Sequence, residues 1–207
     1  MQLLVITYKV YQWQNMAKIN RSTKPTCLEK IVWNKIEQQW FRYKSKQKWE
    51  KFVKTKCYKI VKLELMRMCN DTCPFTFVTN PPEIFFEIEH FKPKSNIKFK
   101  NLEFEWTNLF PIYRYVNTLK NKTWDDSLQS PGDIDYLEYL FMNKFVGTEH
   151  YCHIQPKKQD KKSVDIAQKI IEIYHLNNPK MVAMRKWWFE INELKLQKYP
   201  FKSIFNN

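Results

Sequence analysis

The chain has 207 residues, enough for one ordinary domain or for a small core with an added helical part. Hydrophobic residues make up 43% of it, which allows a packed core and excludes disorder over the whole length. Lys and Arg number 35 against 21 Asp and Glu, and this net charge of +14 indicates an anionic partner, most simply nucleic acid. The alternative is a basic protein whose charged surface is only solvated.

Several classes of protein are disfavoured by residues that are rare or absent. The two glycines, Gly132 and Gly147, stand alone, whereas P-loops and dinucleotide folds hold phosphates with clustered glycines. The five cysteines are odd in number and unevenly spaced, which predicts no disulfide framework and a reducing, cytoplasmic compartment. Residues 1–13 lack the charged start and cleavage site of a signal peptide, so we interpret them as strand or core. No apolar run approaches the roughly 18 residues that span a membrane.

The first predicted part, residues 1–56, is a basic and helical segment. Thr26 and Glu29 have the spacing of a capping box, which predicts the start of a helix. Residues 42–56 are dense in lysine, which is typical either of a helix that contacts phosphate or of a solvated face. Apolar residues follow the capping box at helical spacing, namely Leu28, Val32, Ile36 and Trp40.

The second predicted part, residues 57–130, contains a helix, a strand and a second, short helix. Residues 57–68 have helical apolar spacing, and residues 69–82 are rich in turn formers. Apolar and other residues then alternate over 84–89, which predicts a strand that ends on Glu89 and His90. Residues 92–105 are expected to form a basic loop, followed by a short helix near Asn117.

The third predicted part, residues 131–207, is helical and is expected to form one compact unit with the rest. One helix begins near Ser163, and Asn178-Pro179 starts another, because proline suits the first helical position. The apolar face of the first helix comprises Ala167, Ile170, Ile171 and Tyr174. The second helix continues inward with Met181, Met184, Trp188 and Ile191, which we interpret as core.

Three motifs contain the residues with candidate chemistry: EHFKPK at 89–94, WTNL at 106–109 and YRYVNTLK at 113–120. Hydrolysis of a phosphodiester needs a base that activates water, a cation that neutralises developing charge, and a group that orients the base. Histidine suits the first role because its pKa lies near neutrality, and Glu and Asn oxygens suit Mg²⁺. A single His at the end of a strand is more often structural, so the prediction depends on the three motifs together.

The order and spacing of these motifs resemble the HNH endonucleases, in particular a subgroup with E-H-F-x-P-K, then W-x-N-L, then C-x-x-C-N-x-x-K. Residues 166–185 resemble the helical tail of this subgroup, so the resemblance covers about residues 57–190. It implies an α+β, mostly helical fold with a small ββα-metal core at 57–130, flanked by N- and C-terminal helices. It also implies hydrolysis of DNA with Mg²⁺ or Mn²⁺. The subgroup is similar to the nuclease component of Septu-like bacterial antiviral systems, which implies an ABC/SMC-like ATPase as protein partner.

The resemblance assigns a role to each motif residue. His90 would be the general base, and Asn108 would orient it or its loop. Glu89 and Asn117 would hold the divalent metal, and Asn117 would belong to the catalytic set as well. Glu87 would lie on the same strand face as Glu89 and support the metal site. Contacts with nucleic acid would come from Lys92, Lys94, Lys120 and Lys122.

The chain departs from the subgroup at its structural zinc site. The two Cys-x-x-Cys pairs map to Cys73 and Thr76 and to Tyr113 and Val116, so three of the four ligands are missing and no structural zinc is expected. We expect the replacements to fill the space by apolar packing, together with Phe75 and Phe77.

Two other groups contain metal-ligating residue types. One is Cys69 with Cys73, and the other is the run His150, Cys152 and His153. Zinc sites usually have paired spacing, which neither group has, so roles in packing or at the surface are favoured over metal binding.

Two functions from different classes remain. The first is an active HNH endonuclease that cleaves DNA. The second is a non-catalytic nucleic-acid-binding or assembly subunit on a decayed HNH scaffold. Loss of the zinc thiolates favours the second function, and retention of Glu89, His90, Asn108 and Asn117 favours the first. A secreted nuclease toxin is disfavoured, since no receptor or secretion module is recognised.

Overall fold

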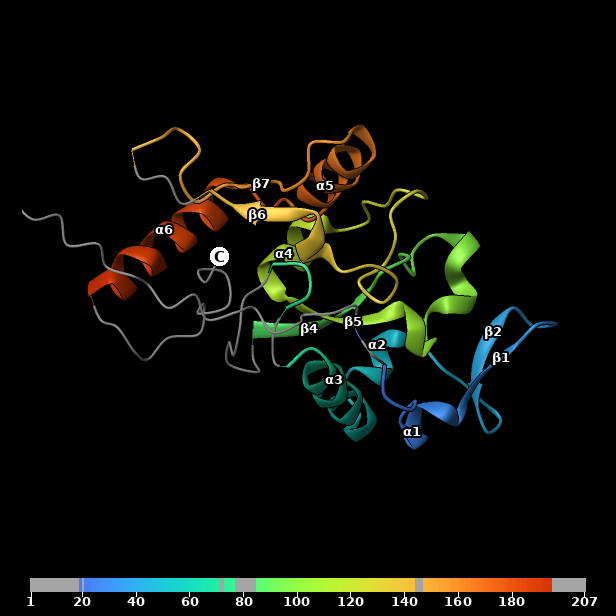
Figure 1. The fold of residues 1–207 in the computed structure, drawn as a ribbon. Coiled ribbons are helices and arrows are strands. Elements are labelled where there is room, and N and C mark those ends of the chain that lie inside the picture. The colour runs from blue at the N-terminus through green and yellow to red at the C-terminus, as the bar shows by residue number, and fades with distance from the viewer. Residues whose placement is uncertain (1–18, 20, 71–72, 77–84, 144–146, 195–207) are drawn as a thin grey trace, which may run out of the picture.

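The computed structural model describes residues 19, 21–70, 73–76, 85–143 and 147–194, with residues 187–194 described by their backbone alone. Helices and small antiparallel sheets give an α+β fold. A central two-stranded sheet lies between helix α3 on one side and helix α4 on the other (Figure 1). In the described residues, no helix is both long and apolar enough to cross a membrane.

The central sheet and the helix that follows it form a strand–strand–helix unit. Strand β4 (Phe86–His90) pairs antiparallel with β5 (Leu109–Tyr113), and helix α4 (Arg114–Lys120) begins directly after β5. In this register His90 lies opposite Leu109. The predicted strand that ends on His90 and the predicted short helix at Asn117 are confirmed.

Helix α3 (Lys56–Met68) covers the other side of the sheet and packs on β5. The Thr55 hydroxyl caps its start by accepting a hydrogen bond from the Tyr58 N–H at 3.2 Å. Val61 and Leu65 are fully buried against the sheet, as the helical spacing predicted.

The prediction of a helical N-terminal segment is wrong for residues 30–48. Helix α1 is a single turn (Thr26–Glu29) whose N-cap is Pro25, so the predicted capping box does not form. A three-stranded antiparallel sheet follows, with β1 (Ile31–Asn34), β2 (Gln39–Arg42) and β3 (Ser45–Lys46), and then the short helix α2 (Trp49–Phe52). The segment is rich in β-branched and aromatic residues, which favour strands. The Asn34 side chain also closes the turn by accepting hydrogen bonds from the backbone N–H groups of residues 36 and 37.

This N-terminal sheet shares a core with the central sheet. Trp40, Trp49 and Phe52 pack in one buried cluster with Ile88 and Leu109 of the central sheet. A disulfide between Cys27 and Cys57 joins α1 to α3, with a Cα–Cα distance of 5.8 Å, and it was not predicted from the sequence. Because disulfides are rare in reducing compartments, this bond argues against the predicted reducing compartment.

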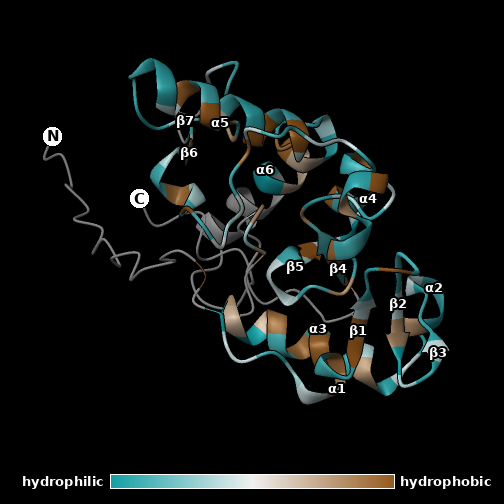
Figure 2. Ribbon diagram, turned by 90° about the vertical axis from the view of Figure 1, so that its right-hand side faces the viewer, coloured by the Kyte–Doolittle hydropathy of each residue, from teal (hydrophilic) through white to brown (hydrophobic). Residues whose placement is uncertain are grey.

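The C-terminal part contains both predicted helices, α5 (Lys161–Ile173) and α6 (Pro179–Leu194). Figure 2 shows hydrophobic and hydrophilic residues distributed along α5, whose Ala167 and Ile170 are fully buried. Two short strands, β6 (Leu140–Met142) and β7 (Ile154–Pro156), pair antiparallel beside α5 and were not predicted. Trp188 and Ile191 lie in α6, but their side chains are outside the described residues, as are residues 1–13.

Candidate active site

His90 lies at the end of β4 with only 6% of its surface exposed. The Trp49 ring meets the imidazole edge to face, with 4.2 Å between the ring centroids. The Nε2 atom lies 2.9 Å from the carbonyl oxygen of Glu103. Because a carbonyl oxygen only accepts, Nε2 must carry the proton and donate, and the neutral ring then keeps Nδ1 as a proton acceptor.

Burial determines the charge of this histidine. Desolvation lowers the pKa of His90 to about 3, while the hydrogen bond to the Glu103 carbonyl opposes the shift. At neutral pH the imidazole is therefore uncharged, which is the form that a general base requires, although a pKa this low makes the buried ring a weak base.

Glu89 points to the opposite face of β4, toward α4. There it forms an ion pair with Lys120, and the exposed fractions of the two side chains are only 7% and 1%. Desolvation raises the pKa of Glu89 to about 7, and the nearby Lys120 ammonium opposes this shift. Glu89 therefore has a buried cation as its counter-ion in the folded protein.

Glu87 shares this face of β4, as the strand alternation predicted, but it lies nearer the surface. Its carboxylate accepts hydrogen bonds from Arg114 Nε and from Asn117 Nδ2, each at 2.9 Å. Asn117 thus contacts Glu87 rather than the predicted co-ligand Glu89.

Asn108 is buried and its side-chain amide joins the two ends of the loop that follows His90. Its Oδ1 accepts a hydrogen bond from the Lys92 N–H at 2.8 Å. Its Nδ2 donates to the carbonyl oxygens of Lys92 and Leu102, each at 3.1 Å. Because Glu103 follows Leu102 directly, this amide fixes the carbonyl that holds His90. Asn108 accordingly acts on the loop and not on the imidazole itself.

Arg21 fixes the backbone around Asn108, and the sequence analysis did not single it out. Its guanidinium donates to the carbonyl oxygens of Trp106, of Thr107 at 2.8 Å and of Leu109 at 3.1 Å. It also lies over the Phe110 ring, with Cζ 4.3 Å from the centroid. Arg21 is 85 residues before Trp106 and belongs to no motif, so no local pattern indicates this contact.

Arg21→Ala is expected to lower the free energy of unfolding by about 2 kcal/mol, because three backbone carbonyls, two of them in part-buried contacts, lose their charged donor. The free energy of unfolding of Arg21→Lys should lie between those of the wild type and Arg21→Ala, since one ammonium cannot reproduce the forked donors of the guanidinium. Urea unfolding measures both. Arg67→Ala is the matched control, because Arg67 is 76% exposed, and its expected loss is below about 0.5 kcal/mol. Equal losses for Arg21 and Arg67 would show that the carbonyl contacts do not stabilise the fold.

The four predicted phosphate-binding lysines differ in position. Lys122 is exposed, Lys92 is half-buried beside the Phe99 ring, and Lys94 is half-buried and forms an ion pair with Glu50 at 3.3 Å. Lys120 is turned inward to Glu89, so it does not present its ammonium at the surface. The predicted phosphate contact of Lys120 does not fit this position, because the buried Glu89 carboxylate needs a counter-ion there.

The oxygen donors on the face of β4 that is turned toward α4 suit a hard divalent cation. Glu87, Glu89 and Asn117 offer two carboxylates and one amide from β4 and α4, and Mg²⁺ takes such ligands while it keeps several waters. Within the described ranges no three His, Cys, Asp or Glu side chains gather as a metal site. The position beside Glu89 is held by the ammonium of Lys120, so a metal that used Glu89 would have to displace it.

Apolar packing surrounds the positions that hold structural zinc in the subgroup. Phe75 and Val116 are fully buried in one apolar cluster, as predicted, and Phe77 lies outside the described residues. The thiol of Cys73 accepts a hydrogen bond from the Tyr113 N–H at 3.4 Å, and burial raises the pKa of Cys73. Cys73 thus contributes to packing between the turn at 73–76 and β5.

The second candidate metal cluster is also tied into packing. The rings of His150 and His153 lie 5.6 Å apart, while the Cys152 side chain is fully buried. The carbonyl of Cys152 accepts a hydrogen bond at 2.7 Å from the buried Arg185 of α6. This arrangement favours the predicted structural role.

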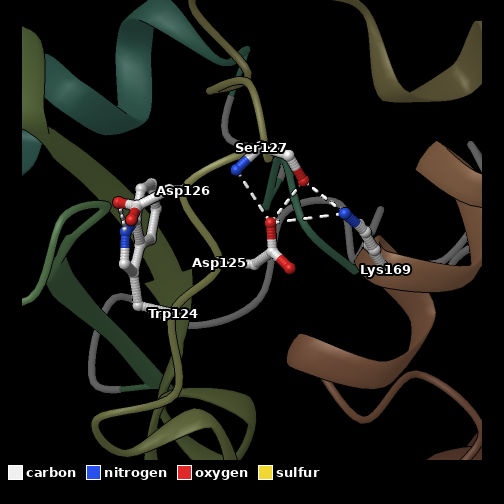
Figure 3. Close-up of polar contacts among 5 residues, drawn as sticks. All are labelled: Trp124, Asp125, Asp126, Ser127 and Lys169. Carbon is white, nitrogen blue, oxygen red and sulfur yellow. Dashed lines mark hydrogen bonds and ion pairs between the residues drawn. The ribbon is translucent and has the colours of Figure 1, made fainter.

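The segment after α4 connects the site to α5. Figure 3 shows Lys169 of α5 directed toward Asp125 and Ser127, with 3.4 Å between Lys169 Nζ and Asp125 Oδ1. In the same segment, the Trp124 ring packs against Phe91, the residue after His90, with centroids 4.8 Å apart. The loop of His90 is therefore supported from two sides, by Trp49 and by Trp124.

No protein-family model matches the chain, and no curated protein matches it. The indications of function therefore come from the geometry of β4, β5 and α4 and from the motif resemblance.

Proposed function

We propose that the protein is a metal-dependent endonuclease of the HNH class that hydrolyses phosphodiester bonds of DNA. The observation that carries the proposal is the clamp formed by Asn108, which fixes the Glu103 carbonyl on His90 Nε2 at the end of a strand–strand–helix unit. Such a clamp orients one ring nitrogen and leaves the other to accept a proton, as an oriented general base requires.

Each residue then has a task in hydrolysis. His90 takes a proton from water at Nδ1, and Asn108 keeps the loop and the ring in position. Glu89 and Asn117 would hold Mg²⁺ or Mn²⁺, with Glu87 beside them, once the metal displaces Lys120 from Glu89. The metal would supply charge stabilisation at the phosphate. Lys92, Lys94 and Lys122 contact phosphates around the reacting bond. By its resemblance to the Septu-like subgroup, we place the protein in the bacterial cytoplasm with an ABC/SMC-like ATPase in an antiviral complex.

Nicking of supercoiled plasmid tests this proposal. With Mg²⁺ or Mn²⁺ the wild type is expected to nick, while His90→Ala and excess EDTA reduce the rate by about 100-fold or more. His150→Ala is the matched control, because His150 is exposed and outside the site, and it should nick like the wild type. If the wild type is silent alone, the assay is repeated with the ATPase partner. Nicking that persists in His90→Ala would overturn the role of His90.

The second candidate function is a non-catalytic DNA-binding or assembly subunit. Three observations favour it. Lys120 neutralises Glu89 in a buried pair, and Trp49 covers His90. Glu89 and His90 are also consecutive in β4 and point to opposite faces, so the metal ligand and the base do not face one another. Under this function the protein binds DNA equally with and without divalent metal and does not nick it with any partner. Metal-dependent nicking lost in His90→Ala excludes it.

A further inference from the structure

A strong concentration of positive charge lies beside the candidate active site, in the segment 30–56, here called the arm. The arm contains nine Lys and Arg against two acidic residues, which leaves seven positive charges, half of the net +14 of the chain. Eight of the nine cations are exposed, and Arg42 is half-buried. The eight exposed cations are Lys30, Lys35, Lys44, Lys46, Lys48, Lys51, Lys54 and Lys56.

Little of this charge is neutralised within the described part of the chain. Lys46 pairs with Glu37 at 3.7 Å, and both side chains are about half exposed. Glu50, the other acidic residue of the arm, pairs with Lys94 of the His90 loop at 3.3 Å. Exposed pairs of this kind contribute little and are screened by salt, so the arm keeps a strong positive potential.

The three strands of the arm form a sheet with one face in the core and one face outward. Trp40 is 2% exposed and packs inward. In the register of the three strands, Val32, Phe41 and Lys46 are directly paired and share the outward face, where Val32 is 56% exposed. Ile36 in the β1–β2 turn is 95% exposed, and Figure 1 shows this hairpin at the edge of the molecule, pointing away from β4 and β5. Basic β-ribbons with an apolar tip suit the grooves of duplex DNA.

The arm is fixed beside the loop that follows His90. The indole Nε1 of Trp40 donates to the carbonyl of Lys100 at 2.9 Å. Trp49, at the end of the arm, contacts the His90 ring itself. A duplex held on the arm would therefore lie next to the loop that contains Lys92 and Lys94.

We propose that the arm is the main duplex-DNA-binding surface of the protein, with the β1–β2 turn at a groove and the lysines on the phosphates. Placement of a phosphodiester bond near His90 rests on the proposed nuclease function, whereas duplex binding by the arm does not.

The test is binding of the full chain to a fluorescein-labelled 30-base-pair duplex, followed by anisotropy in EDTA between 50 and 300 mM salt. Four arm lysines are replaced together: Lys35→Gln, Lys44→Gln, Lys46→Gln and Lys48→Gln. We expect affinity at 100 mM salt to fall about 10- to 100-fold. The slope of log K against log salt should shrink by roughly three to four, because each phosphate contact contributes about 0.9.

The matched control replaces four exposed lysines, two just before α5 and two in its first turn: Lys157→Gln, Lys158→Gln, Lys161→Gln and Lys162→Gln. It removes the same charge from another surface, and its affinity should change less than about threefold. A further variant, Ile36→Ser, keeps all charges and should weaken duplex binding several-fold with an unchanged salt slope. All replaced side chains are exposed, so thermal midpoints should remain within a few degrees of the wild type.

Equal losses in the arm and α5 variants would overturn the proposal, because the affinity would then depend on total charge alone. Tighter binding to single-stranded DNA or to RNA than to the duplex would also overturn it, as would the absence of duplex binding. Binding that depends on the arm lysines, without nicking, would support duplex binding by the arm and contradict the proposed nuclease function. Nicking that depends on His90 but not on the arm lysines would support the nuclease function and contradict duplex binding by the arm.

Discussion

Lys120→Met is expected to lower the free energy of unfolding at pH 8 by about 3–5 kcal/mol, because it leaves Glu89 as a buried charge without a counter-ion. Methionine keeps the unbranched apolar stem of the lysine, so most of the loss reports charge rather than packing. Both side chains of the pair are at most 7% exposed, which leaves little room for water to replace the partner. Urea unfolding at pH 8 and at pH 5 measures the effect.

The loss should be smaller at pH 5 than at pH 8. Burial raises the pKa of Glu89 to about 7 even with Lys120 present, so without Lys120 the carboxyl takes up a proton readily in the folded state. A carboxyl whose pKa rises on folding binds its proton more tightly when folded. Its contribution to stability is therefore present at low pH and is lost as the pH rises from 4.5 through the folded value.

A double variant separates charge from shape. Glu89→Gln with Lys120→Met removes both charges and should recover more than half of the loss at pH 8. Lys122→Met is the control on the exposed side of the same region, with an expected change below about 0.5 kcal/mol. An equal loss at both pH values, without recovery in the double variant, would mean that the ion pair is not the source of stability.

Elements with long, regular apolar spacing could be predicted from the sequence. Helices α3, α5 and α6 have 13 to 16 residues, and the start of α6 at Pro179 follows from the backbone preference of proline. The strand β4 was recognisable because the apolar Phe86 and Ile88 alternate with Glu87 and Glu89 in the sequence.

The N-terminal sheet could not be predicted in the same way. Its strands have two to four residues, too short to distinguish a period of two from a period of 3.6. Leu28, Val32, Ile36 and Trp40 fit the helical spacing, yet Val32 and Ile36 are exposed and only Leu28 and Trp40 are buried. A tertiary contact helps to fix the conformation of this segment, because the Trp40 indole donates a hydrogen bond to the carbonyl of Lys100, far along the chain.

The candidate site could be predicted only in part, because its contacts are also tertiary. The motifs indicated which residues surround the strand end, and the role of Asn108 in closing the loop follows from its position in WTNL. The partners of the charged residues were not evident, since Lys120 and Glu89 meet only when α4 folds onto β4. Arg21 was missed because its partners are backbone carbonyls, which any sequence offers.

His90→Gln is expected to remove most of the loss of stability that the wild type suffers between pH 6.5 and pH 4. Burial lowers the pKa of His90 to about 3, so the unfolded chain binds a proton in this range and the folded protein does not. His90 therefore stabilises the fold fully above pH 6.5, and this contribution is lost as the pH falls. Over the full range down to about pH 3 it amounts to about 3–5 kcal/mol, and somewhat less by pH 4.

Glu89 has the opposite dependence and must be removed from the comparison. Its raised pKa makes the fold more stable as the pH falls from 7 to 4.5, which partly masks the effect of His90. Unfolding is therefore measured against pH in the Glu89→Gln background, with and without His90→Gln, and His150→Gln in that background is the exposed control. If the free energy of unfolding falls just as steeply with decreasing pH after His90→Gln, His90 is already charged or solvated in the folded protein. That outcome would show that burial against Trp49 and the Glu103 carbonyl does not keep the folded imidazole from taking up a proton.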